Sequence, residues 1–302
     1  MNMSATEDEL DDIRDGLVVL NKPFGVKVHG HDKPGARSKA GQNSASSIPV
    51  CDFTVEEALP HLKSYLKVSD LSILKSAERY TSGIMLLSAD QKISKNVKRS
   101  FDIAKSRKLP HLIHWMLTLG YPVATYKKER VGIKFLEAGE GEIRQPVIVN
   151  EVSRRAVALK RIHPVLVEFR VLSTNPALPT SLVEIATSSV KFHFVRVYAS
   201  DRIATILGDV LYSSRMNTLL GVPVKAQIQK TLSFDMQPLP EKVAEKLGVP
   251  KGAVGHSMIP TMLHLRSIIL PSFRGEDLIL TAELPMHFRW TKDKLNLLSE
   301  CK

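Results

Sequence analysis

One short stretch of the chain brings together side chains that could do chemistry. Glu78 and Arg79 are adjacent, and the small residues of Thr81-Ser82-Gly83 lead from them into an apolar run at residues 84–87. A carboxylate next to a cation stays ionised, so it can act as a nucleophile or as a base. The apolar run predicts a short buried strand, and the small residues before it predict an irregular turn. The pattern thus predicts a charged group held rigidly at the edge of a sheet.

The bulk properties favour a globular protein with a polyanionic partner. Of the 302 residues, 43% are hydrophobic, which is enough to build a core. Lysine and arginine number 42 against 31 acidic residues, which gives a net charge of +11. This balance favours nucleic acid over a small neutral substrate. No apolar run approaches the length needed to cross a bilayer.

The sequence predicts neither a metal site nor a cofactor. Cys51 and Cys301 are the only cysteines and lie far apart, so neither a disulfide framework nor a zinc site is expected. The histidines are scattered, and no glycine-rich loop has the spacing that cradles phosphate. The cysteine usage fits a reducing or matrix-like compartment.

Helices and strands of both kinds are expected. Short apolar runs at residues 17–20 and 71–74 predict buried strands, and period-two alternation over 165–190, broken by Asn175-Pro176-Ala177, predicts an antiparallel pair. Thr54 and Glu57 have the spacing of a capping box before an amphipathic helix. The mixture predicts an α+β fold.

A second helix, over residues 90–108, is predicted to carry a basic surface. Ile93, Val97, Phe101 and Ala104 recur at helical spacing, and lysines and arginines crowd the other faces. Such charge can be a solvated helix face or a contact with the RNA backbone. On the second interpretation we expect Lys95, Lys98 and Arg99 to bind RNA.

The domain organisation is predicted to be simple. We expect a short acidic N-terminal segment at 1–16, one domain over 17–290 and a C-terminal tail at 291–302. Residues 31–49 are rich in small and polar residues, which predicts a mobile insertion. The acidic start is unlike an arginine-rich transit peptide, so none is visible in the chain.

The stretch around Glu78 resembles the active-site loop of the RluA-type RNA pseudouridine synthases, which reads His-Arg-Leu-Asp-Arg-x-Thr-Ser-Gly before an apolar strand. Aligned on Thr81-Ser82-Gly83, Arg79 matches the second arginine, and Glu78 stands where the family keeps its nucleophilic aspartate. Lys75-Ser76-Ala77 fills the His-Arg-Leu positions.

Further segments resemble the family in the same order, over about residues 17 to 290. Asn21-Lys22-Pro23-Phe24-Gly25 resembles its Asn-Lys-Pro-x-Gly turn, which is expected to project Lys22 from a strand end. The run Lys191-Phe192-His193-Phe194-Val195-Arg196 resembles Arg-x-His-Gln-Ile-Arg. Ile206-Leu207-Gly208-Asp209 resembles Ile-Leu-Gly-Asp, and the closing segments are at 262–270 and 282–285.

The resemblance implies a fold, a reaction and a set of residues. The fold is a long, bent, mostly antiparallel mixed sheet with flanking helices and a central RNA cleft. Glu78 and Arg196 are implied as catalytic carboxylate and partner cation, within salt-bridge reach of each other. Trp115 or Tyr126 is implied as the ring that stacks on the target base, although either could be a core aromatic. The other implied contacts are Arg79 and Leu265 for the substrate, and Lys22, Lys191 and His193 for RNA.

Two hypotheses remain open. In the first, the protein isomerises uridine to pseudouridine in mitochondrial messenger or ribosomal RNA, because details such as the Leu-Gly-Asp and Tyr-Ser segments are similar to a mitochondrial subgroup of the family. In the second, a fold that has lost the reaction binds RNA or assists mitochondrial ribosome assembly. Glu78 separates the two, since glutamate adds one methylene and shifts the carboxylate by about 1 Å, which can cost on the order of a hundredfold in rate.

Overall fold

The computed structural model describes residues 16–30, 53–136, 144–219, 222–225, 237–250 and 259–298. The predicted acidic segment, apart from Gly16, and the predicted insertion at 31–49 lie outside these ranges. The chain divides into two compact units. The first contains Met1–Ala104 and Leu265–Glu283, and the second contains Lys105–His264 and Leu284–Lys302.

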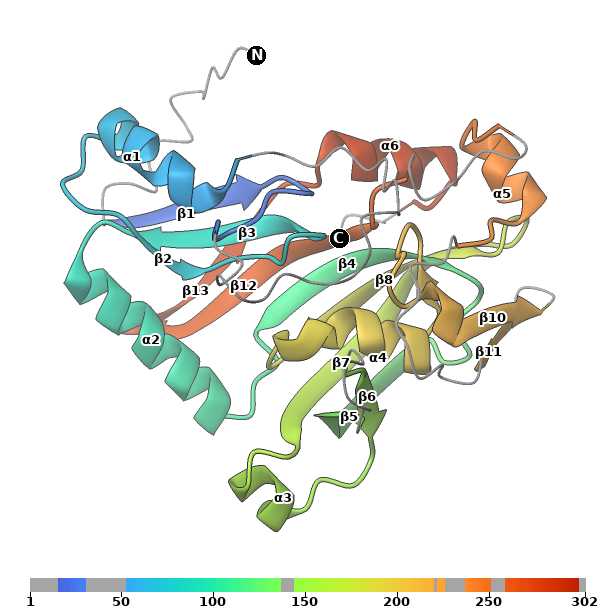
Figure 1. Cartoon of the computed structure of the whole chain (residues 1–302), viewed down its shortest axis with the longest axis horizontal. Helices are drawn as coiled ribbons and strands as arrows, with labels where there is room; N and C mark the ends of the chain where they lie inside the picture. The colour runs from blue at the N-terminus through green and yellow to red at the C-terminus, as the bar shows by residue number, and fades with distance from the viewer. Residues whose placement is uncertain are drawn as a thin grey trace. The chain divides into compact units, whose positions relative to one another are not determined.

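The sheet of the first unit is built around β3 (Ser82–Ser88), which is buried along its whole length. β1 (Leu17–Lys22) pairs antiparallel with it over Leu17↔Ser88 to Lys22↔Gly83. β2 (Ser72–Lys75) pairs antiparallel with its far end, and β12 (Leu263–Phe273) is its neighbour on the other side of the strand order. β13 (Glu276–Thr281) pairs with β12 (Figure 1). A strand with neighbours on both edges and both faces covered must be apolar throughout, as residues 84–87 are.

Two helices complete the first unit. α1 (Val55–Leu66) begins with the predicted capping box, in which the Thr54 hydroxyl accepts from the Glu57 amide and the Glu57 carboxylate accepts from the Thr54 amide. Its apolar side packs against buried residues of β1 and β3, including Val18, Met85 and Leu87. α2 (Gln91–Ser106) confirms the predicted amphipathic helix, since Ile93, Val97, Ser100 and Ala104 are buried.

The sheet of the second unit runs in the order β4-β8-β7-β5-β6. Its strands are β4 (Leu112–Leu119), β5 (Tyr126–Phe135), β6 (Pro146–Val149), β7 (His163–Asn175) and β8 (Thr180–Thr187), and neighbours in this order pair antiparallel. β7 and β8 form the predicted hairpin, and the Asn175 side-chain oxygen accepts from the amides of Ala177 and Leu178 in its turn.

Shorter elements surround this sheet. They are α3 (Arg154–Ala158), α4 (Phe194–Arg202), β9 (Thr205–Ile206), β10 (Met216–Leu219), β11 (Val222–Lys225), α5 (Glu241–Lys246) and α6 (Met286–Lys294). α6 runs across position 290, where the sequence predicts a tail to begin, and Leu295 and Leu297 after it are fully buried. Leu295 and Leu297 therefore belong to a buried cluster of the second unit, and the predicted boundary at 290 stays a prediction.

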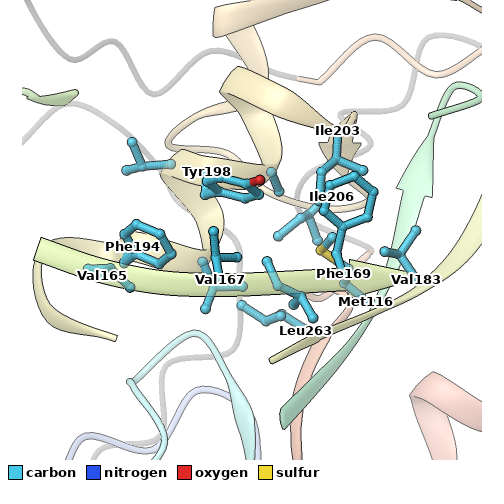
Figure 2. Packing of buried hydrophobic residues seen from close by; sticks show 14 of the residues in the cluster. Met116, Val165, Val167, Phe169, Val183, Phe194, Tyr198, Ile203, Ile206 and Leu263 are labelled. Carbon is cyan, nitrogen blue, oxygen red and sulfur yellow. The ribbon is translucent and has the colours of Figure 1, made fainter. Parts of the chain in front are cut away.

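The main core of the second unit lies between α4 and one face of the sheet. Figure 2 shows Phe194 and Tyr198 of α4 above Val165, Val167 and Phe169 of β7. The rings of Phe194 and Tyr198 are stacked, with their centroids 5.5 Å apart. Because side chains alternate along a strand, the residues between these apolar ones point to the opposite face.

The described elements give the predicted α+β class, with an open sheet and flanking helices. Within the described ranges, no helix is long and apolar enough to span a membrane. The same part of the chain contains no group of three or more His, Cys, Asp or Glu side chains that could hold a metal ion.

Candidate active site and RNA interface

The loop that carries Glu78 connects β2 to β3 in the first unit. The amide of Thr81 donates to the carbonyl of Glu78 (3.1 Å), which closes a tight turn immediately before the buried strand. Glu78 is half-buried, whereas Thr81 and Ser82 are buried. The structure thus places a carboxylate on a short turn at the start of β3, as the sequence predicts.

A second turn braces this loop. The amide of Gly25 donates to the carbonyl of Arg79 (2.9 Å), and the rings of Phe24 and Tyr80 lie 6.1 Å apart. Both contacts come from the Lys-Pro-Phe-Gly segment that follows β1. The turn that follows β1 therefore packs against the loop that carries the candidate carboxylate.

Lys22 has a structural task in this turn. Its ammonium donates to the carbonyls of Pro23 (2.9 Å) and Val26 (3.2 Å), and the residue is only 3% exposed. The two carbonyls favour the ammonium form, but burial lowers the pKa of Lys22 to about 8. The side chain folds back instead of projecting from the strand end, and a contact between Lys22 and RNA stays a prediction.

Gly83 is required by the packing behind the loop. Its φ is +121°, and a Cβ at this position would lie 2.3 Å from the carbonyl oxygen of Leu265. No other residue type fits such a close approach of two backbones. Leu265 itself is 1% exposed, so its side chain lies in the interior of the unit. Its predicted role as an apolar wall for the substrate stays a prediction.

Arg79 follows Glu78 in the same turn and is half-buried. Its guanidinium carbon is 5.0 Å from the centroid of the Tyr80 ring, in cation–π geometry. Its Nε atom is buried and has no hydrogen-bond partner in the described structure. The arrangement keeps a positive charge one residue away from Glu78.

In the second unit, Arg196 forms a buried ion pair. Its Nε donates to Oδ2 of Asp209 (2.9 Å), its Nη2 donates to Oδ1, and both side chains are 2% exposed. Asp209 also accepts from the amides of Leu211 (2.9 Å) and Tyr212 (3.2 Å). The predicted pairing of Arg196 with Glu78, which belongs to the first unit, stays a prediction.

Sequence reasoning did not identify Asp209 as the partner of Arg196. The signal was present, because Asp209 lies in the Ile-Leu-Gly-Asp segment that resembles the family. Gly208 before it is also constrained, since a Cβ there would lie 2.3 Å from the carbonyl oxygen of Pro260. This segment therefore positions a carboxylate that orients the arginine.

His193 and Lys191 precede α4 in a short 3₁₀ turn, Lys191–His193. Nδ1 of His193 lies 2.9 Å from the hydroxyl of Tyr212, and the two rings meet edge to face. His193 is exposed as a residue, but partial burial of its ring, and then the charge of Arg196, lower its pKa to about 4. The imidazole is therefore neutral at pH 7, while Lys191 is exposed.

Trp115 and Tyr126, the two candidates for stacking on the base, lie in one row. The registers pair Trp115 with Glu184, Glu184 with Arg170, and Arg170 with Tyr126, so the row crosses β4, β8, β7 and β5. Directly paired residues share a face of the sheet, and this is the face opposite α4. Glu184 accepts from the Trp115 indole (3.0 Å) and from Nε of Arg170 (2.8 Å).

The two rings differ in exposure. Trp115 is half-buried against the apolar cluster of Leu117, Leu119 and Leu182, whereas Tyr126 is 56% exposed. The Tyr126 hydroxyl donates to Glu168 (3.1 Å), and this hydrogen bond raises the pKa of the phenol. Sequence reasoning did not identify Glu184, which stands in the sequence only as a charged residue in an alternating strand. Its carboxylate connects Trp115 with Arg170 in this row.

The basic side chains of α2 are exposed. Lys92, Lys95, Lys98 and Arg99 all lie on its solvent side, opposite the buried positions. The helix therefore presents a positive surface, as predicted. Contact of Lys95, Lys98 and Arg99 with RNA stays a prediction.

Comparison with known proteins gives a consistent result. The chain is 27% identical over 285 residues to mitochondrial mRNA pseudouridine synthase RPUSD3 from Homo sapiens. The alignment covers 93% of this chain and 74% of that protein. It is 26% identical over 294 residues to pseudouridylate synthase RPUSD4, mitochondrial, from Mus musculus, covering 93% and 67%. No family model matches the sequence.

The fold points to the same class. The solved structure titled Human RNA Pseudouridylate Synthase Domain Containing 4 matches with a TM-score of 0.63 at 23% identity, covering 93% of this chain and 90% of that one. The fold is thus that of the pseudouridine synthases. The chain is a homologue of proteins named RPUSD3 and RPUSD4, consistent with the RluA type, and these homologues are named as mitochondrial.

Proposed function

We propose that this protein is an RNA pseudouridine synthase that converts uridine to pseudouridine in mitochondrial messenger or ribosomal RNA. The observation that carries the proposal is the similarity along 93% of the chain to proteins named as mitochondrial pseudouridine synthases. The loop of Glu78 supports it, because a carboxylate sits on a braced turn beside a cation.

The reaction is an isomerisation and needs no redox partner. The bond from C1′ of the ribose to N1 of uracil breaks, the freed base rotates, and a bond from C1′ to C5 forms. C5 then loses its proton and N1 takes up a proton, so that the product is an isomer of the substrate. The carboxylate of Glu78 acts on the sugar or on the uracil, either as a nucleophile or as a general base. Arg196 is the partner cation that the family resemblance implies, and an aromatic ring at Trp115 or Tyr126 stacks on the uracil.

The target base must leave its stack to reach such a carboxylate. The family resemblance implies an inserting arginine where this chain has Ser76, and a serine cannot fill the space of a base. Arg79 lies three residues further on in the same loop, with its guanidinium beside the Tyr80 ring.

We propose that the reaction takes place on RNA in the mitochondrial matrix.

A second function is favoured by one observation, the glutamate at the position of the family's aspartate. On this alternative the protein binds RNA without modifying it and contacts mitochondrial ribosome assembly proteins. The basic α2 surface and the stacking row would serve this function equally well. The two functions differ in whether the carboxylate of Glu78 is needed.

The experiment compares mitochondrial RNA from cells that lack the protein with RNA from cells that express a variant. We expect pseudouridine at some sites to vanish without the protein and to return with the wild type. Glu78→Gln, which is nearly isosteric but uncharged, should leave those sites unmodified. Glu78→Asp, which restores the family's residue, should return them.

The matched control is Glu276→Gln, the same chemical change at an exposed position of β13. It should restore every site. If Glu78→Gln also restores every site, Glu78 is not the catalyst. If no site depends on the protein, the RNA-binding alternative replaces the enzyme.

A further inference from the structure

Two phenylalanine side chains in the second unit are exposed beside each other. Phe135, at the end of β5, is 39% exposed, and Phe192, in the turn before α4, is 43% exposed. Their rings meet edge to face with centroids 4.8 Å apart. His163, at the start of β7, lies edge-on to Phe192 with centroids 6.1 Å apart. We call these three residues the Phe192 cluster.

The backbone holds Phe192 in this position against its own preference. Its φ and ψ are 61° and 35°, and His193 follows with 56° and 34°. Two consecutive non-glycine residues in the left-handed region are strained, most of all for a bulky aromatic side chain. The strained pair turns His193 toward Tyr212 and Phe194 into the core, and leaves the Phe192 ring at the surface.

The surroundings of the cluster are positively charged. Lys191 precedes Phe192 and is exposed, as is Lys105. Burial, and then the charges of Lys191 and Lys105, lower the pKa of His163, so both charges act on its ring. Nε2 of His163 is 2.9 Å from the hydroxyl of Ser189, so the ring is fixed in place.

We propose that the Phe192 cluster is a second stacking platform, which binds an unpaired base of the RNA other than the target uridine. An aromatic face beside lysine ammonium groups is the combination that binds single-stranded nucleic acid, because the ring stacks on a base and the cations follow the phosphates. An apolar protein partner would gain nothing from the two lysines. The platform rests on the proposed action on RNA, and it explains why a strained backbone exposes a phenylalanine.

The test uses two fluorescein-labelled probes of equal length, an oligouridylate and an abasic oligomer with the same backbone. Phe192→Leu should weaken binding of the oligouridylate by at least about fivefold, the lower limit for losing one stacked base. Binding of the abasic probe should not change. Phe192→Tyr keeps a ring and should bind like the wild type.

The dependence of RNA affinity on salt distinguishes the contribution of the Phe192 ring from that of the lysines. Phe192→Leu should leave the slope of affinity against salt unchanged, whereas Lys191→Gln should reduce it. Phe53→Leu, which removes an exposed ring just before α1, a helix whose first turn is acidic, is the matched control and should have no effect on either probe. If Phe192→Leu does not fold, Phe192→Gly suits the left-handed backbone and removes the same ring.

Each outcome decides the proposal. Equal binding of the oligouridylate by the wild type, Phe192→Leu and Phe135→Leu would overturn the platform and leave the cluster to a protein partner. An equal loss on both probes would also overturn it, because the ring would then act through folding. If the wild type binds neither probe, the platform proposal is wrong. The proposed enzyme activity is tested separately, by mapping pseudouridine in RNA from cells that carry Glu78→Gln.

Discussion

The guanidinium of Arg196 and the carboxylate of Asp209 form a two-pronged ion pair, and both side chains are 2% exposed. Arg196 lies in the first turn of α4, whereas Asp209 lies beyond the end of the helix. The pair therefore fixes the start of α4 to the segment that follows it. A buried arginine held in this way has a single orientation, which is what a positioned reaction requires.

The first prediction concerns this ion pair. Asp209→Asn leaves the Arg196 charge buried without a counter-charge, and the free energy of unfolding should fall by about 3 kcal/mol or more. Urea unfolding measures the loss. Asp293→Asn removes a carboxylate that is 67% exposed and pairs with Lys292, so it should cost less than about 1 kcal/mol. Equal stability of the two variants would show that the buried pair does not hold the fold.

The second prediction concerns Gly83. Gly83→Ala places a Cβ 2.3 Å from the Leu265 carbonyl oxygen at a φ of +121°, and neither backbone can move aside. We expect a loss of about 4 kcal/mol or more, which combines strain with overpacking. Gly275→Ala has a φ of +103° but open space around it, so it reports the strain alone and should cost about 1–2 kcal/mol. A similar cost at both positions would contradict the close approach.

The third prediction is a pH dependence from Lys22. Its pKa is about 8 in the folded protein and 10.5 ordinarily, so the unfolded chain binds more protons between these values. The free energy of unfolding therefore rises with pH across this window. Relative to Lys22→Met, the wild type should gain stability between pH 8 and pH 10.5, by up to about 3 kcal/mol. A constant difference between the two proteins would mean that the ammonium is solvated.

The fourth prediction concerns the α2 surface. Replacing Lys95, Lys98 and Arg99 by glutamine should weaken RNA binding and reduce the slope of log affinity against log salt by roughly two, at about 0.7 per lost contact with a single strand. Lys242, Lys246 and Arg289 are exposed residues elsewhere, and their replacement removes the same charge. The control should change the slope little. If both triple variants lose the same slope, only net charge matters.

The fifth prediction separates the two rings of the row. Tyr126→Leu removes an exposed ring, so it should weaken binding of uridine-rich RNA by at least about fivefold while urea unfolding stays unchanged. Trp115→Leu removes a ring that packs on the apolar cluster and donates to Glu184, so it should lower stability. An RNA-binding loss at Trp115 alone would assign the stacking role to the tryptophan.

The local signals in the sequence predicted local structure well. The capping box at Thr54, the strand at residues 84–87 and the hairpin at 165–190 depend on neighbours in the chain, and the structure confirms them. The tail predicted after residue 290 depended on contacts far away. Leu295 and Leu297 are buried there, and the Asn175 side chain donates to the Leu295 carbonyl.

The candidate site was predictable only in part for the same reason. The motifs located the Glu78 loop and the Lys22 turn separately, but the hydrogen bond between Gly25 and Arg79 that joins them is a tertiary contact. The fold-back of Lys22 follows from carbonyls that a sequence does not orient. Likewise, the row from Trp115 to Tyr126 needs the registers of four strands, which no single stretch encodes.

The close approach of Gly83 to Leu265 also has a consequence for synthesis of the protein. The loop with the carboxylate is made long before the strand that backs it, β12, leaves the ribosome. Contacts between such distant segments form slowly. A nascent chain that lacks β12 therefore holds its carboxylate without this support, and the finished geometry arises only after β12 has been made.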